Sequence, residues 1–138
     1  MQIQITVDAR DPHELVHFWT QALDYREEHN DDFVRQMIAA GNISEDDVVE
    51  VRGHLQFRDG AACADPEGLR PRLYFQLVPE AKSAKNRVHL DLPYGREERD
   101  AQVARLEELG ATRAYEGHQE PHPWITMRDP EGNEFCVS

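Results

Sequence analysis

The chain has 138 residues, which is enough for one domain or for two small modules that share a core. Its formal net charge of −12 repels phosphate backbones and anionic lipids, so we expect neither nucleic acid nor membrane among its partners. Only two cysteines are present, no apolar run approaches the ~20 residues that cross a bilayer, and the first residues lack a signal-peptide pattern. These features predict a cytoplasmic globular protein.

Residues 2–7 alternate between polar and apolar side chains, which predicts a half-buried strand. Asp11 and Pro12 then fit the N-cap and the first position of a helix. Apolar side chains follow with helical spacing: Leu15, Phe18, Trp19, Ala22 and Leu23. Short strands are predicted next, at residues 25–28, 54–58, 61–64 and 72–78.

Residues 31–52 have no counterpart in the second half of the chain. Phe33, Met37 and Ile38 have helical spacing, and Ser44 followed by Asp47 is typical of the start of a second short helix. We therefore expect a helical insertion at about residues 31–52. It is either a lid or an interface, or an inert elaboration of a surface loop.

The second half repeats the first. Residues 87–92 form the next predicted strand, and a helix over residues 96–109 follows and ends at Gly110. The apolar face of that strand carries Val88, Leu90 and Leu92. Strands are then predicted at residues 111–115, 124–128 and 134–137. Position for position, Gln4 corresponds to His89 and Thr6 to Asp91.

The tetrapeptide Asp-Pro-Glu-Gly occurs twice, at residues 65–68 and 129–132. Each copy precedes the last strand of its half, where proline sets φ and glycine permits the positive φ of a turn. The chain therefore contains two βαβββ modules within one domain, module one at residues 1–80 and module two at residues 86–138.

Two stretches resemble a known superfamily. The run from Phe18 to Tyr25 after the first strand resembles the opening of the vicinal oxygen chelate superfamily, and residues 86–92 and 124–137 resemble its second module. More narrowly, the chain is similar to glyoxalase-like domain proteins of the glyoxalase/bleomycin resistance type. The resemblance implies an α+β fold in which two βαβββ modules form a curled mixed sheet around a cleft, with the helices on the outer face.

Strand parity predicts which side chains line that cleft. If the apolar strand faces meet the helices, the opposite faces carry the ligand-binding candidates: Gln4, Thr6, Gln56, Tyr74, Gln76, His89, Asp91, Trp124, Glu134 and Cys136. An aromatic lining with a few polar groups fits a small organic molecule. Core packing between the modules is the alternative for Tyr74 and Trp124.

Metal-dependent members of the superfamily place a ligand on the first and last strand of each module. The resemblance carries these positions to Gln4, Gln76, His89 and Cys136, where relatives usually have His or Gln, Glu, His and Glu. His89 matches and Gln4 is acceptable, but both carboxylates are missing. Nickel, iron and manganese prefer imidazole and carboxylate ligands, so we expect no cofactor and no family-type metal site.

If a divalent metal is bound, its ligands are expected to be His89, Glu134, Gln4 and Cys136, and the thiol would favour zinc. Otherwise His89 is interpreted as a neutral imidazole bonded to Asp91 or to a ligand. Cys136 is then a small buried hydrophobic residue, and Glu134 is paired with an arginine such as Arg128.

The run His13-Glu14-Leu15-Val16-His17 matches the zinc-binding pattern of metalloproteases. Both histidines lie opposite the apolar stripe of the predicted helix, so we interpret the run as a polar helix face exposed to solvent.

Residues 118–123 are predicted to form a rigid, proline-containing loop before Trp124. In this position His122 could act as a general acid or base over the cleft. The alternative is a plain connecting loop.

We therefore expect a homodimeric small-molecule binding protein without a family-type metal. The alternative is a metal-dependent lyase or isomerase of the glyoxalase type, in which His89 and Glu134, the best catalytic candidates, hold a metal or move protons. A third possibility is an interaction module that uses the insertion. The sequence leaves open the ligand, and whether the modules pair within one chain or between two.

Overall fold

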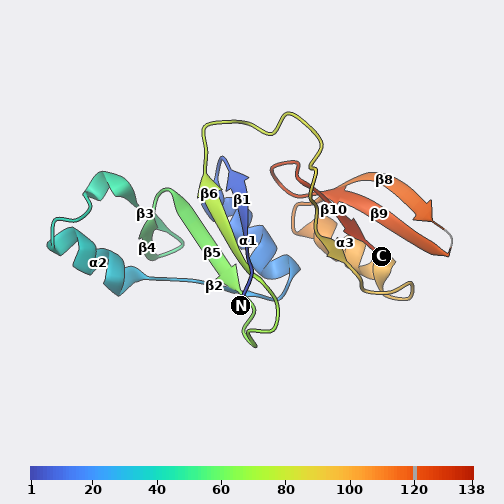
Figure 1. Ribbon diagram of the computed structural model, residues 1–138, viewed down its shortest axis with the longest axis horizontal. Helices are drawn as coiled ribbons and strands as arrows, with labels where there is room; N and C mark the ends of the chain where they lie inside the picture. The colour runs from blue at the N-terminus through green and yellow to red at the C-terminus, as the bar shows by residue number, and fades with distance from the viewer. Residues whose placement is uncertain (120) are drawn as a thin grey trace. The chain divides into compact units, whose positions relative to one another are not determined.

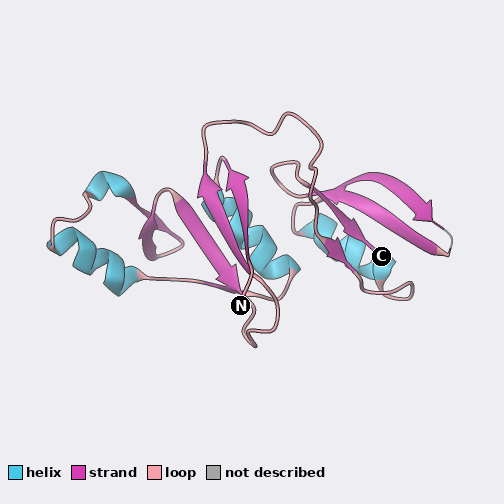
Figure 2. Ribbon diagram, viewed as in Figure 1, coloured by secondary structure: helices cyan, strands magenta, loops and turns pink. Residues whose placement is uncertain are grey.

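The computed structural model describes residues 1–119 and 121–138. This part of the chain forms an α+β fold with mixed sheets, and it divides into two compact units, unit one (Met1–Glu80) and unit two (Ala81–Ser138) (Figures 1 and 2). No helix among the described residues is both long and apolar enough to cross a membrane.

Unit one contains a four-stranded sheet in the order β1-β6-β5-β2, a separate two-stranded sheet of β3 and β4, and two α-helices. The strands are β1 (Gln4–Ala9), β2 (Arg26–Glu27), β3 (Val48–Val51), β4 (His54–Phe57), β5 (Gly60–Ala64) and β6 (Arg72–Leu77). The helices are α1 (Pro12–Ala22), α2 (Asp31–Ala39) and the short 3-10 helix η1 (Glu45–Asp47). β1 and β6 are parallel, whereas β5 pairs antiparallel with both β6 and β2.

The insertion is only partly helical. Helix α2 and the Ser44-capped η1 lie where helices were predicted, but β3 replaces the expected helical end and pairs with β4. Val48, Val49 and Val51 are β-branched, and such side chains favour extended backbone. The prediction of a wholly helical insertion was therefore wrong at residues 48–51.

Helix α1 begins as predicted, with the Asp11 carboxylate accepting the Glu14 N–H at 3.1 Å and Pro12 in the first turn. Its apolar stripe is buried against β5 and β6. His13, however, is only 7% exposed, and its Nε2 donates to the Phe57 carbonyl at 3.0 Å. The prediction that this histidine faces solvent was wrong, because its ring is bonded to the backbone of β4 in the buried interior of unit one.

Unit two contains one four-stranded sheet, in the order β7-β10-β9-β8, and helix α3. Its elements are β7 (Asp91–Leu92), α3 (Arg99–Glu108), β8 (Thr112–Gln119), β9 (His122–Arg128) and β10 (Glu134–Val137). β7 pairs parallel with β10, and the other two pairings are antiparallel.

The strand predicted over residues 87–92 is confined to its last two residues, and Val88 is 82% exposed instead of facing the core. A contact with a residue far along the chain takes the place of the expected backbone pairing. Upstream of β7, the Asn86 N–H donates to the Glu134 side chain, not to the backbone of β10. The parallel ladder therefore begins only where Leu90 accepts the Cys136 N–H.

The loop predicted over residues 118–123 is also wrong in its described part, because β8 and β9 extend through it as a hairpin. His118 pairs with Pro123, and Gln119 pairs with His122. Residue 120 of that predicted loop lies outside the described residues.

Both Asp-Pro-Glu-Gly copies form the same turn. Asp65 accepts the backbone N–H groups of Leu69 and Arg70 at 2.9 and 3.0 Å, and Asp129 accepts those of Glu131 and Asn133 at 3.0 and 2.9 Å. Each aspartate is buried, so its carboxylate supplies acceptors that water cannot. The repeat thus marks two structurally equivalent turns.

We expect Asp65→Asn to destabilise the protein at neutral pH and to remove part of its acid sensitivity. The Arg70 guanidinium and three backbone N–H groups hold the pKa of Asp65 far below its ordinary value of about 3.9. A carboxyl whose pKa is lower in the folded state than in the unfolded state stabilises the fold at pH values above its unfolded-state pKa. This stabilisation is lost as the pH falls toward the folded-state pKa. Urea unfolding between about pH 6 and pH 3 should show the difference between wild type and variant shrinking with acidification.

The exposed Asp46 supplies the control substitution, Asp46→Asn. A difference between wild type and Asp65→Asn that stays constant across this pH range would contradict the assigned role of the Asp65 carboxylate.

Candidate functional site

One face of the unit-two sheet carries a cavity of about 370 Å³, within the range of pockets that hold small organic molecules. Alternate residues of β9 and β10 form its floor, as the two-residue period of a strand requires. Its lining comprises Lys85, His89, Asp91, Tyr115, Gln119, His122, Trp124, Thr126, Glu134, Cys136 and Ser138. Five predicted site residues are therefore gathered in one place: His89, Asp91, Trp124, Glu134 and Cys136.

Sequence reasoning missed the contribution of β8. A register shift between Arg113 and Tyr115 brings Tyr115 directly opposite Thr126, and Tyr115 and Gln119 both line the cavity. The alternation of Tyr115, Gly117 and Gln119 was the available signal, but the predicted strand stopped at residue 115.

Gly117 shapes the aromatic wall. A Cβ atom at this position would lie 2.5 Å from the Trp124 ring, so the indole occupies the space above the glycine backbone. Residues 117 and 124 are opposite one another in the β8–β9 ladder. A side chain at residue 117 would therefore displace the ring that lines the cavity.

His89, Asp91 and Cys136 form a cluster on this face. The His89 Nδ1 lies 2.9 Å from Asp91 Oδ1 and 3.9 Å from Cys136 Sγ, and the three candidate ligand atoms lie within 4.8 Å of one another. Burial raises the pKa of the Cys136 thiol, which is also hydrogen-bonded with Thr126. A thiol of raised pKa is a poor nucleophile, so the cluster favours hydrogen bonding over covalent chemistry.

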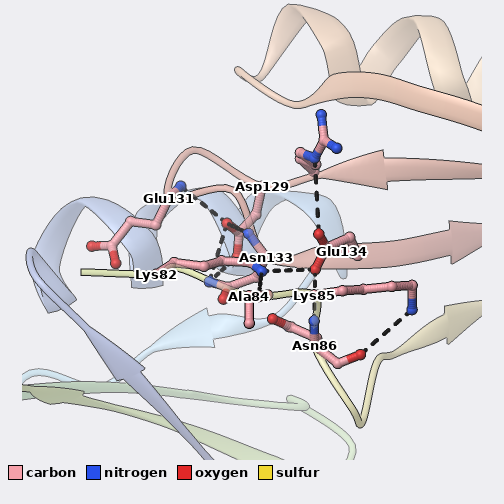
Figure 3. A network of polar contacts seen from close by, with 9 residues as sticks. Lys82, Ala84, Lys85, Asn86, Asp129, Glu131, Asn133 and Glu134 are labelled. Carbon is pink, nitrogen blue, oxygen red and sulfur yellow. Dashed lines mark hydrogen bonds and ion pairs between the residues drawn. The ribbon is translucent and has the colours of Figure 1, made fainter. Parts of the chain in front are cut away.

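Glu134 is held by the segment that precedes β7. Its carboxylate lies 2.9 Å from Lys82 Nζ and 3.9 Å from Arg128 Nε, and it accepts the Asn86 N–H at 2.9 Å (Figure 3). Burial alone would raise the Glu134 pKa, but the Asn86 N–H and Lys82 outweigh it and lower the pKa to about 2. Glu134 is thus a structural carboxylate whose nearest cation is Lys82, whereas the sequence suggested Arg128.

The unit-two residues do not fit a manganese, iron or nickel centre of the kind the superfamily uses. The last-strand position carries a thiol of raised pKa, and the nearby carboxylate already accepts from a lysine and a backbone amide. These metals prefer several anionic oxygen ligands in addition to imidazole, and in this cluster Asp91 is the single carboxylate. His89, Asp91 and Cys136 together supply imidazole, carboxylate and thiol, a donor set suited to zinc.

The five candidates in unit one are dispersed. Gln4 donates to Thr6 and accepts a hydrogen bond from Arg72, and Gln76 is exposed on β6. Gln56 is 6% exposed, and together with Tyr74 it lines a separate, smaller cavity. Unit one therefore does not bring its five predicted residues into one group.

The strand register revises the position assigned to Gln76. Tyr74 lies opposite Thr6 in unit one, as Cys136 lies opposite Asp91 in unit two. Because Thr6 corresponds to Asp91, Tyr74 and not Gln76 is the equivalent of Cys136. The shift arises because six positions separate Gly68 from Tyr74, whereas four separate Gly132 from Cys136.

Several solved structures share this fold. A glyoxalase/bleomycin resistance protein/dioxygenase family enzyme from Burkholderia phytofirmans has a TM-score of 0.62 and 14% identity, over 97% of this chain and 94% of its own. Fosfomycin resistance protein FosX from Mesorhizobium loti has a TM-score of 0.61 and 12% identity, over 99% and 89%.

A mutant FosX from Listeria monocytogenes, complexed with Mn(II) and 1S,2S-dihydroxypropylphosphonic acid, has a TM-score of 0.64 and 13% identity, over 99% of this chain and 89% of its own. None of the curated proteins compared with the chain matches it. Residues 4–138 match the family described as glyoxalase-like domain. The chain therefore belongs to the glyoxalase-like domain family.

Proposed function

We propose that the protein binds a small organic molecule in the unit-two cavity without a family-type metal. The hydrogen bonding of Glu134 supports this proposal, because its carboxylate is already bonded to Lys82 and Asn86. In addition, the thiol of Cys136 stands at the position where metal-binding relatives have a carboxylate. The cavity keeps its hydrogen-bonding groups and its aromatic wall.

The lining favours a planar, largely uncharged ligand. Trp124 and Tyr115 offer aromatic surface, on which a flat ring system stacks favourably. Lys85 and Asp91 contribute one charge of each sign, the Glu134 carboxylate is paired with Lys82, and Gln119 adds a neutral amide. A few polar groups in an aromatic pocket fix the orientation of a ligand, whereas the apolar contact supplies most of its affinity.

We expect Trp124→Ala to weaken ligand binding by at least about tenfold, equivalent to ~1.4 kcal/mol, because the variant loses the largest aromatic surface of the cavity. Ligand-observed NMR against a library of heteroaromatic compounds would supply the ligand, and titration would measure both affinities. Phe33→Ala, which removes an exposed aromatic side chain of the insertion, is the control. Equal affinities of wild type and Trp124→Ala would rule out this cavity as the binding site.

A metal-dependent lyase or isomerase is the second candidate, favoured by the grouping of His89, Asp91 and Cys136. A bound zinc ion would act as a Lewis acid toward a substrate oxygen. In this chain His89 would keep its orientation through Asp91, and Glu134 would remain paired with Lys82.

Metal content separates the two candidates. We expect untagged protein to retain far less than one metal per chain after incubation with Zn, Ni, Fe or Mn and removal of excess ion, as measured by elemental analysis, and we expect His89→Ala and wild type to agree. Near-stoichiometric zinc that is lost in both His89→Ala and Cys136→Ser would instead support the enzyme.

The cytoplasmic location and the homodimer stay predictions. Light scattering at several protein concentrations tests the second of them.

A further inference from the structure

Unit one has a cavity of its own, of about 230 Å³, which is below the usual size of pockets for drug-sized ligands. The insertion supplies one wall, through Val34 of α2 and the neighbouring Asn30. Gln56 and Phe57 of β4 supply a second wall. The floor is the β5–β6 face, and helix α2 of the insertion packs on β4, which in turn contacts β5.

The floor is the counterpart of the unit-two site. Ala62 pairs with Tyr74, just as Thr126 pairs with Cys136. A Cβ atom at Gly60 would lie 2.2 Å from the Tyr74 hydroxyl oxygen, so the phenol extends over the glycine. The floor therefore presents a hydroxyl group and small side chains, whereas the unit-two floor presents an indole.

Charge sets the ligand preference. The Arg72 guanidinium donates to both Glu28 oxygens, at 2.8 and 2.7 Å, and also to Gln4, so three of its five N–H donors are used and its charge is paired with Glu28. This hydrogen bonding lowers the Glu28 pKa and keeps the carboxylate ionised. Asp59 also lines the cavity and has no ion pair among the residues that the structure describes. The lining thus contains two carboxylates, Glu28 and Asp59, and one guanidinium, Arg72, so its net charge is negative.

The amide of Gln56 adds hydrogen-bonding capacity. It is buried, and the side-chain bond recorded for it is a long contact of 3.5 Å to Glu27. A buried amide usually makes shorter bonds, so a ligand would compete with a weak contact for this group. Carboxylate, amide and hydroxyl oxygens around one small space are the partners of an ammonium group.

We propose that this cavity, enclosed by the insertion and the β5–β6 face, is a second ligand site that takes a small alkylammonium compound. The site uses only residues of unit one, so it stands or falls independently of ligand binding in unit two. It also gives the insertion a role in forming a ligand site.

The test uses three probes of nearly equal size: n-butylammonium, n-butanol and butyrate. Each is titrated into ¹⁵N-labelled full-length protein while the backbone amides of Gly60 and Ala62 and the side-chain amide of Gln56 are followed by NMR. We expect saturable shifts of these signals with butylammonium and much weaker binding of the alcohol and the acid. Asp59→Asn should weaken butylammonium binding about three- to fivefold, the loss of one partly exposed charge contact.

Gln56→Met should weaken binding to a similar extent, and circular dichroism would check that this core variant folds. Asp46→Asn and Gln36→Met place the same changes on exposed residues outside the cavity and should leave affinity unchanged. Equal binding of butyrate or butanol, shifts confined to unit-two residues, the absence of a saturable shift, or unaltered affinity in Asp59→Asn would each overturn the proposal.

Discussion

Replacing Phe135 by alanine is expected to lower the free energy of unfolding by about 3–5 kcal/mol. Phe135 is fully buried in β10, the strand paired on both sides by β7 and β9, and it belongs to a core that includes Leu106 and Met127. Truncation removes the buried ring and leaves a cavity that rigid strands fill only in part. Domains of this size are typically stable by only about 5–15 kcal/mol, so urea unfolding should detect the change readily.

The adjacent residue provides a matched control. Cys136 points to the opposite face of β10, toward the cavity, so Cys136→Ala should change the free energy of unfolding by less than about 1.5 kcal/mol. Comparable losses from both substitutions would contradict the assignment of the core and cavity faces of this strand.

Replacing Glu134 by alanine is expected to lower the free energy of unfolding by about 1–3 kcal/mol, the second large effect. The substitution leaves the Asn86 N–H and the Lys82 ammonium without their carboxylate partner. Because these residues anchor the segment that leads into β7, the variant should also weaken binding in the unit-two cavity. Urea unfolding and ligand titration measure the two effects.

A double-mutant cycle with Lys82→Ala isolates the ion pair, and we expect the combined loss to be smaller than the sum of the two single losses. Glu116→Ala, on the exposed part of β8, is the control for removing a negative charge. If Glu134→Ala left stability unchanged but lowered metal content, Glu134 would be a metal ligand, and the metal-free proposal would be wrong.

Local sequence signals predicted the elements whose hydrogen bonds are local or whose buried face is continuous. Strand β10 coincides with its predicted range, and α1 starts at the predicted cap. The repeated Asp-Pro-Glu-Gly turn located the last strand of each half, because its aspartate bonds to amides only a few residues away. The α+β fold and the family followed from these elements.

Distant contacts explain where these signals failed. His13 has the helical position of a solvent-facing residue, yet it is buried, and its ring is bonded to the carbonyl of Phe57, 44 residues further on. Val88 has the alternation of a core residue, yet it is exposed because Asn86 bonds to Glu134, 48 residues away. Neither partner is encoded in the periodicity around these residues.

The sequence by itself determined the repeated βαβββ units, the alternating faces of their strands and the candidates His89, Trp124 and Cys136, because these depend on periodicity and turn chemistry within a few residues. Only the tertiary structure decided that the Glu134 carboxylate is bonded to Lys82 and Asn86. The tertiary structure also placed Tyr115 of β8 in the lining of the unit-two cavity, and Val34 of the insertion in the lining of a second cavity. The physical reason is that the local backbone sets the face of a strand or helix to which a side chain points, whereas the partner of that side chain depends on how distant strands pair and pack.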